Sequence, residues 1–132
     1  MADEEASRFS PQAAVDRAFW MVNGPVLLVM LGPAVALFVA GSSLGAKTPL
    51  GAGFEIAAGF AFLVCWPLAW LTWSILIPHW RIWAYERVQD IEELKRLAVE
   101  ARVIWPEGHI FQRTEICPRA LRKRLEDLEA NR

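Results

Sequence analysis

Tryptophan is concentrated in the second apolar stretch of this chain, where five copies fall within eighteen residues. They are Trp66, Trp70, Trp73, Trp80 and Trp83. All but the last, together with Ile77, recur at alternating spacings of four and three, so they share one face of a helix. Residues 54–78 carry a single charge, Glu55 at the outer end, and this pattern predicts a helix that spans a membrane.

An aromatic belt at the membrane boundary accounts for Trp80 and Trp83, but it does not account for Trp66. Trp66 precedes Pro78 by twelve residues, or about 18 Å along a helix. We therefore expect the Trp face to contact a partner protein or a flat ligand, with lipid contact as the alternative. The pattern requires no cofactor, although it is compatible with a bound lipid or pigment.

The chain has 132 residues and is 55% hydrophobic, with its apolar residues concentrated between Phe19 and Trp83. A net charge of −1 offers no general attraction for nucleic acid. This composition predicts one membrane unit with a small water-facing extension. The acidic stretch 1–7 lacks the positive region of a secretory signal peptide, so we expect both apolar segments to be retained as spans.

We predict an all-α membrane protein, built as a two-span antiparallel transmembrane helical hairpin with a short N-terminal interfacial helix and cytoplasmic C-terminal helices. Its expected segments are 1–24 (acidic N-terminus and interfacial helix), 25–78 (the hairpin) and 79–132 (the cytoplasmic helical extension). The spans are expected at about 26–43 and 54–78, since eighteen residues of helix reach roughly 27 Å. The Gly-rich connection between them is too short to fold alone.

Positive charge is distributed unevenly around the two spans. Lys and Arg number two before the first span, one between the spans and eleven after the second. The positive-inside rule therefore predicts that both termini face the cytoplasm. The Ala- and Arg-rich composition indicates a bacterial cytoplasmic (inner) membrane, with an organellar inner membrane as the alternative.

The segment before the first span has the signals of a separate short helix. Ser10 suits an N-cap and Pro11 a first helical position. One apolar face, which predicts a helix lying along the membrane surface, is formed by Ala14, Val15, Ala18, Phe19 and Val22. The sequence Asn23-Gly24-Pro25 is expected to end this helix, and the alternative is one long helix kinked at Pro25.

Small residues recur every four positions on both spans, and such faces let helix backbones approach closely in lipid. On the first span they are Gly32, Ala36 and Ala40, and on the second Gly53, Ala57, Ala61, Cys65 and Ala69. We expect these faces to meet, which would leave the Trp face pointing outward. The alternative is that Gly and Ala are simply common in membrane helices.

Beyond Pro78, residues 81–104 show an apolar 3–4 repeat with charges on the other faces, which predicts one cytoplasmic helix. Its stripe includes Ile91 and Leu94. Residues 109–117 have no clear period and are expected to form a strand or a loop. Pro118 then opens a final helix with an apolar face of Leu121, Leu125 and Leu128. This helix is short, so we expect it to dock on the preceding stripe or on a partner.

Few residues suggest catalytic or metal chemistry. His79 and His109 are about thirty residues apart, with no other ligand at metal-site spacing, so we expect no metal site. Cys65 and Cys117 lie in different predicted segments and are not expected to form a disulfide. No nucleophile elbow or phosphate-binding loop is present, and enzymatic activity is not expected.

These features favour a non-catalytic accessory or structural subunit, or adaptor, of a larger integral membrane complex. The residues expected to bind partners are Trp66, Trp70, Trp73, Trp80, Trp83, Ile91, Leu94, Leu121, Leu125 and Leu128. The alternative is a homo-oligomeric pore of the mechanosensitive or holin-like kind, although neither span offers a polar stripe to line a channel. A third reading is an anchor that tethers a soluble enzyme through the final helix.

Overall fold

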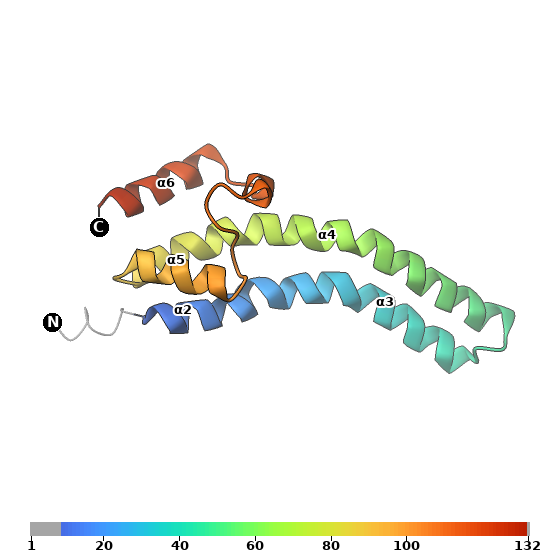
Figure 1. Ribbon diagram of the computed structural model, residues 1–132. Helices are drawn as coiled ribbons and strands as arrows, with labels where there is room; N and C mark the ends of the chain where they lie inside the picture. The colour runs from blue at the N-terminus through green and yellow to red at the C-terminus, as the bar shows by residue number, and fades with distance from the viewer. Residues whose placement is uncertain (1–8, 132) are drawn as a thin grey trace. The chain divides into compact units, whose positions relative to one another are not determined.

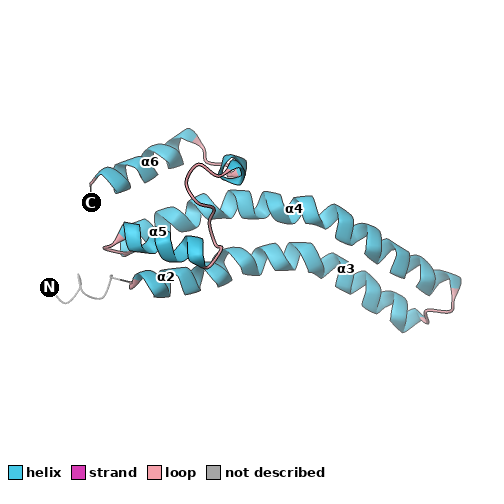
Figure 2. Cartoon of the chain, in the orientation of Figure 1, coloured by secondary structure: helices cyan, strands magenta, loops and turns pink. Residues whose placement is uncertain are grey.

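The computed structural model describes residues 9–131, and within that range the chain is all-helical with no strand. Its elements, drawn in Figures 1 and 2, are α2 (Pro11–Ala18), η1 (Phe19–Asn23), α3 (Gly24–Leu44), α4 (Pro49–Arg87), α5 (Ile91–Glu100), η2 (Ile110–Thr114) and α6 (Arg119–Ala130). Two helical stretches, Pro11–Leu44 and Pro49–Arg87, are long and apolar enough to cross a membrane.

The chain divides into two compact units. Among the described residues, the first combines 9–23 with 73–131, and the second is Gly24–Thr72. The first unit thus brings residues of the predicted segments 1–24 and 79–132 together, and α4 contributes residues to both units.

The predicted start of the N-terminal helix is confirmed, because the Ser10 hydroxyl accepts a hydrogen bond from the Ala13 N–H at 3.2 Å. The role expected for its apolar face is wrong. Ala14, Val15, Ala18 and Val22 are buried, and α2 packs on α5, so most of the face that was expected to lie on the membrane is covered by protein, whereas Phe19 is 48% exposed. The sequence pattern identified an amphipathic helix but could not distinguish lipid from a packing partner.

The predicted stop at Asn23-Gly24-Pro25 is also wrong, and the alternative of a continuous helix is correct. η1 is a π-helix that joins α2 directly to α3. Pro25 lacks an N–H and would collide with the preceding turn of a regular α-helix. The wider π turn just before Pro25 accommodates the proline, so the chain stays helical.

In the second unit, α3 and the start of α4 are joined by a short turn in which Gly45 has φ +91° and the Thr48 N–H donates to the Gly45 carbonyl at 2.8 Å. The two helices approach most closely beside this turn. A Cβ added to Gly41 would lie 2.9 Å from the Gly51 carbonyl oxygen, and one added to Gly51 would lie 2.3 Å from that of Gly45. Only glycine permits this approach.

The small residues predicted to form the helix contact are distributed unevenly around it. Ala69 and Cys65 are buried, and Ala40, Ala57 and Ala61 are half-buried. Ala36 is exposed, and a Cβ added to Gly32 would meet only Leu28 of its own helix. The tightest packing is therefore at Gly41 and Gly51, which the four-residue repeat did not include.

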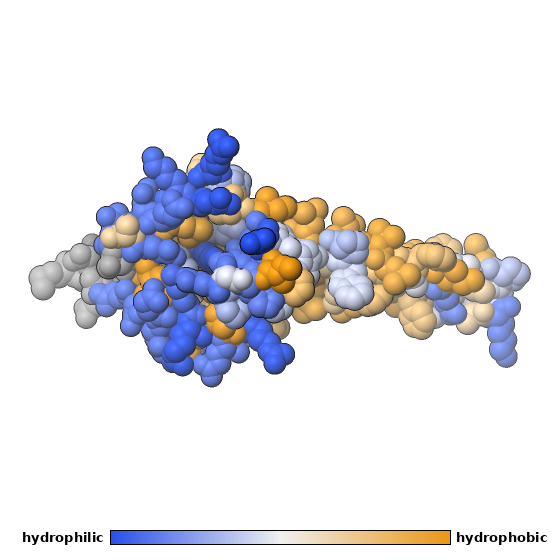
Figure 3. All heavy atoms as spheres, turned by 45° about the horizontal axis from the view of Figure 1, so that its top comes forward, coloured by the Kyte–Doolittle hydropathy of each residue, from blue (hydrophilic) through white to orange (hydrophobic). Residues whose placement is uncertain are grey.

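Large apolar side chains cover the outside of this second unit, as the orange surface in Figure 3 shows. They include Leu28, Phe38, Phe60, Leu63 and Trp66. Two of its hydroxyl side chains bond to their own helices, since Ser43 donates to the Val39 carbonyl and Thr72 to the Leu68 carbonyl. An apolar exterior with small residues inside is the reverse of a water-soluble bundle.

The first unit has a conventional apolar core beneath a charged surface (Figure 3). Its most buried large side chains are Trp80, Ile77, Leu94 and Val88. Two long-range hydrogen bonds attach the N-terminal segment to the end of α4. The Trp80 indole donates to the Ala14 carbonyl at 3.1 Å, and the Phe9 N–H donates to the Arg87 carbonyl at 2.9 Å.

The predicted single helix over 81–104 is wrong, because α4 ends at Arg87 and α5 begins at Ile91. Asp90 caps α5 by accepting a hydrogen bond from the Glu93 N–H at 2.9 Å. The break allows α5 to pack on α2 and bury its apolar stripe, which a continuous helix would leave exposed. Arg102, at φ 57°, ends α5 with the Val103 N–H bonded to the Ala98 carbonyl.

Of the last two elements, α6 agrees with the prediction and η2 was not predicted. Residues expected to form a strand or loop contain the short 3₁₀ helix η2. The final helix does begin after Pro118, as predicted, and extends to Ala130.

Candidate functional site

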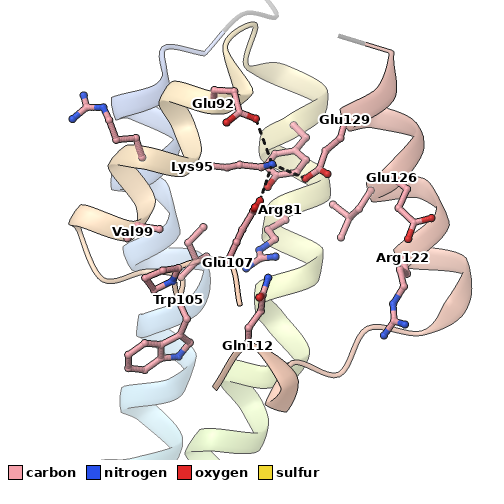
Figure 4. A pocket seen from close by; sticks show the side chains of 15 residues that line it. Arg81, Glu92, Lys95, Val99, Trp105, Glu107, Gln112, Arg122, Glu126 and Glu129 are labelled. Carbon is pink, nitrogen blue, oxygen red and sulfur yellow. Dashed lines mark hydrogen bonds and ion pairs between the residues drawn. The ribbon is translucent and has the colours of Figure 1, made fainter. Parts of the chain in front are cut away.

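A cleft of about 520 Å³ lies in the first unit, between α4, α5, α6 and the segment that links the last two (Figure 4). Charged side chains of both signs line it, together with Tyr85 and Trp105. α4 contributes Arg81, α5 contributes Lys95, and α6 contributes Glu129. The cleft is therefore the place where the C-terminal elements meet the core.

Lys95 is the centre of the cleft, and Figure 4 shows three carboxylates turned toward its ammonium group. Its Nζ lies 3.0 Å from Glu129, 3.3 Å from Glu107 and 3.5 Å from Glu92. Burial opposes the charged form, but the hydrogen bonds to Glu129 and Glu107 outweigh it and raise the pKa of Lys95. Lys95 therefore stays charged and links three separate segments.

Arg81 and Glu115 form a second, more enclosed ion pair at 2.8 Å, with the Glu115 side chain only 7% exposed. Burial raises the pKa of Glu115, and the Arg81 guanidinium partly opposes that rise. The Nε atom of Arg81 is buried and has no hydrogen-bond partner among residues 9–131. This pair fixes the linking segment to the first charged residue after the apolar stretch of α4.

A proline in α4 provides the neighbouring attachment point. Pro78 has no N–H, so the Ser74 carbonyl lacks the donor that a regular helix would supply. The Ile116 N–H takes that place, donating to the Ser74 carbonyl at 2.9 Å. Glu115 and Ile116 thus bind α4 at points about two turns apart, one through an ion pair and one through the backbone.

α6 is connected to α4 and α5 by ion pairs. None of its residues is buried, and its predicted partner-binding residues Leu121, Leu125 and Leu128 are half-buried. Arg124 pairs with Glu86 of α4, and Glu129 pairs with Lys95 of α5. The apolar stripe that was expected to receive α6 is buried in the core, where Ile91 and Leu94 lie.

The five tryptophans have different environments. Trp66 is 61% exposed and Trp70 is also exposed, whereas Trp73 is half-buried. Trp80 is 1% exposed, so it is a core residue and presents no outward surface. The sequence placed these side chains on one helix face, but that face is exposed at one end and buried in a protein core at the other.

Trp83 belongs to an aromatic and cationic cluster with the N-terminal segment. Its ring meets Phe9 edge-on at 5.3 Å between centroids. The guanidinium groups of Arg17 and Arg87 lie 5.3 and 5.1 Å from the ring centroid. These contacts join the first described residues to the end of α4.

The histidines and cysteines show no shared site. The His79 ring nitrogen Nδ1 lies 2.8 Å from the Ile75 carbonyl, and His109 stacks on Trp105 at 4.8 Å between centroids. Cys65 and Cys117 are free. Within the described part of the chain, no three His, Cys, Asp or Glu side chains are placed to hold a metal ion.

Sequence reasoning missed Lys95, Arg81 and Glu115 as the residues that organise the C-terminal part. Two sequence signals could have predicted the chain path that brings these residues together. Asp90 followed by Glu93 is a capping pattern that predicts a new helix. Pro78 predicts a carbonyl in need of an outside donor.

Comparison with known proteins identifies no relative, because no family model, curated protein or solved structure matches this chain.

Proposed function

We propose that this chain is a non-catalytic accessory subunit, or adaptor, of a larger integral membrane complex. α3 and most of α4 form its transmembrane hairpin, and the first unit lies on the cytoplasmic side of a bacterial inner membrane. The observation that carries this proposal is the contrast in exposure: the second unit leaves its large apolar side chains outside, whereas the first buries them.

Water would penalise the second unit strongly. Each exposed Å² of apolar surface costs roughly 25 cal/mol in water, so side chains such as Leu28, Phe60 and Leu63 favour a bilayer or a partner. Bilayer insertion also suits a helical backbone whose hydrogen bonds are internal. The excess of Lys and Arg after the second span supports a cytoplasmic first unit.

Trp66 and Trp70 are the side chains that we assign to a partner within the membrane. Both are exposed, and Trp66 does not lie at the level where an aromatic belt would place it, because it precedes Pro78 by about 18 Å. Large rigid aromatics contribute much of the binding energy at protein interfaces. A flat pigment or lipid on the same face is the competing occupant.

The non-catalytic part of the proposal rests on how the charged groups are used. Lys95 neutralises carboxylates of three segments, Arg81 is engaged with Glu115, and Arg124 with Glu86. Each of these pairs connects elements that are distant in sequence. In this arrangement the charged groups stabilise the fold. They are engaged with one another and are not positioned to exchange protons with a substrate.

The test is co-purification from native membranes in mild detergent, followed by mass spectrometry of the size-separated complex. Trp66→Ala and Trp70→Ala should each reduce partner recovery, by up to ~30-fold if the residue contributes about 2 kcal/mol. Phe60→Ala is the matched control, because Phe60 is equally exposed but lies roughly 120° around the helix from Trp66. A chain that runs alone, or partner recovery unchanged in both Trp variants, contradicts the proposal.

A further inference from the structure

We infer that the segment after α5 is a second membrane contact, which inserts into the headgroup boundary of the same bilayer that α4 crosses. Its apolar side chains Ile110, Phe111 and Ile116, here called the loop patch, are 70%, 41% and 46% exposed. This inference rests on the membrane anchorage in the proposed function.

The position of the loop patch along α4 follows from the Ser74 carbonyl. The Ile116 N–H bonds to that carbonyl, so Ile116 lies at the level of Ser74. Ser74 precedes Arg81, the first charge after the apolar stretch, by seven residues, or about 10 Å of helix. Ile116 is therefore held on the apolar side of that charge, at the depth expected for a headgroup boundary.

The surface of α4 at this level is also apolar and exposed. Ile75, next to Ser74, is 41% exposed. The loop patch therefore continues the exposed apolar surface of the helix, and Figure 1 shows η2 beside α4. Continuity with a helix surface that already requires lipid favours the bilayer as the occupant of the patch.

The other side chains of this segment suit a membrane boundary. Trp105 stacks with His109 and contacts the Phe111 ring at 5.0 Å between centroids, which gives an aromatic group with polar edges. Two exposed basic residues, Arg113 and Arg119, lie within three residues of the patch, and the two acids at the same distance are both paired, Glu115 with Arg81 and Glu107 with Lys95. Basic residues beside apolar ones complement anionic lipid headgroups.

The experiment is spin labelling of single cysteines in full-length protein reconstituted into phosphatidylcholine vesicles containing phosphatidylglycerol. The background carries Cys65→Ala and Cys117→Ala, and labels are placed at Ile110→Cys and Phe111→Cys. Collision rates with oxygen, which concentrates in lipid, and with a water-soluble nickel chelate are measured for each label. Far-UV circular dichroism checks that each variant keeps its helix content.

Two reference labels separate this inference from the function on which it rests. Phe60→Cys reports on the outside of α4 and Lys123→Cys on the exposed face of α6. We expect the loop-patch labels to have an oxygen-to-nickel ratio several times that at Lys123 and approaching that at Phe60.

Three results would overturn the inference in different ways. A ratio equal to that at Lys123 means that the patch faces water. Protection from both reagents means that a protein covers it. If Phe60 itself favours the nickel chelate, the membrane anchorage fails and this inference fails with it, whereas a lipid-exposed Phe60 beside a water-exposed patch leaves the anchorage intact.

Discussion

The two compact units place the same kinds of residue in opposite environments. In Gly24–Thr72, small residues are inside and large apolar ones outside, whereas in the other unit Ile77, Trp80 and Leu94 form a core beneath ion pairs. Trp66 and Trp80 illustrate the difference, since they share a helix and a face but are 61% and 1% exposed. Helix periodicity determines which residues are neighbours, while the surrounding chain determines what those neighbours contact.

The sharpest test of this contrast is a pair of tryptophan truncations. Trp80→Ala removes a buried ring and the hydrogen bond to the Ala14 carbonyl, and should cost about 3–5 kcal/mol of stability. Trp66→Ala should change stability far less. Thermal unfolding in mild detergent, followed by near-UV circular dichroism, measures both, and equal losses would break the contrast between the units.

The second test concerns the close helix approach beside the turn. Gly51→Ala places a Cβ 2.3 Å from the Gly45 carbonyl oxygen, so the backbone must move, at a cost of about 1–3 kcal/mol. Gly53→Ala is the control, because an added Cβ there meets nothing within 4 Å. Titration with SDS, followed by far-UV circular dichroism, compares the two. If Gly53→Ala is as damaging, the packing lies on the face that the small-residue repeat predicted.

The third test concerns the charged attachment of α6. Lys95→Met removes a cation shared by Glu129, Glu107 and Glu92, and should loosen α6 by about 1 kcal/mol, since partly exposed ion pairs contribute little individually. Limited proteolysis near Pro118 should become faster. Added salt should have a similar effect on the unmodified chain. Lys123→Met makes the same charge change on α6 and should leave the cleavage rate unchanged, and equal rates in the two variants would contradict this role for Lys95.

The smallest expected effect is a pH dependence from Glu115. Because burial raises the pKa of Glu115 in the folded state, the folded chain holds this proton more tightly than the unfolded chain does. Stability should therefore decline as the pH rises from the ordinary Glu pKa to the raised one. Glu115→Gln should remove that decline. The midpoint of thermal unfolding is measured over a range of pH for Glu115→Gln and the unmodified chain. If the midpoint changes with pH equally in both, Arg81 compensates the burial of Glu115 fully.

Several local features were predictable because they depend on adjacent residues alone. The Ser10 cap, the helix start after Pro118 and the two long apolar helices follow from short-range chemistry, and all three are present. The turn between α4 and α5 was not predicted, although Asp90 and Glu93 form a capping pattern that indicates a helix start there. The apolar repeat continues across the break, and this favoured a single helix.

The site in the first unit could not be predicted in the same way. Arg81 is 34 residues from Glu115, and Arg124 is 38 residues from Glu86. Nothing in the local pattern selects one carboxylate over the many others. The turn at Asp90 and the carbonyl that Pro78 leaves open are local features, but the residues that pair across them meet only after the chain has folded back.

The sequence by itself determined that this chain is helical, that two of its helices are apolar enough to cross a membrane, and that its charges are concentrated after the second. Those properties are set by composition and by spacings within a few turns. Only the tertiary structure decided that the N-terminal helix packs on α5, that Trp80 is core while Trp66 is surface, and that Lys95 links three segments. The physical reason is that burial and ion pairing depend on which distant segments fold against each other, and the N-terminal helix lies more than sixty residues from its hydrogen-bond partner Trp80.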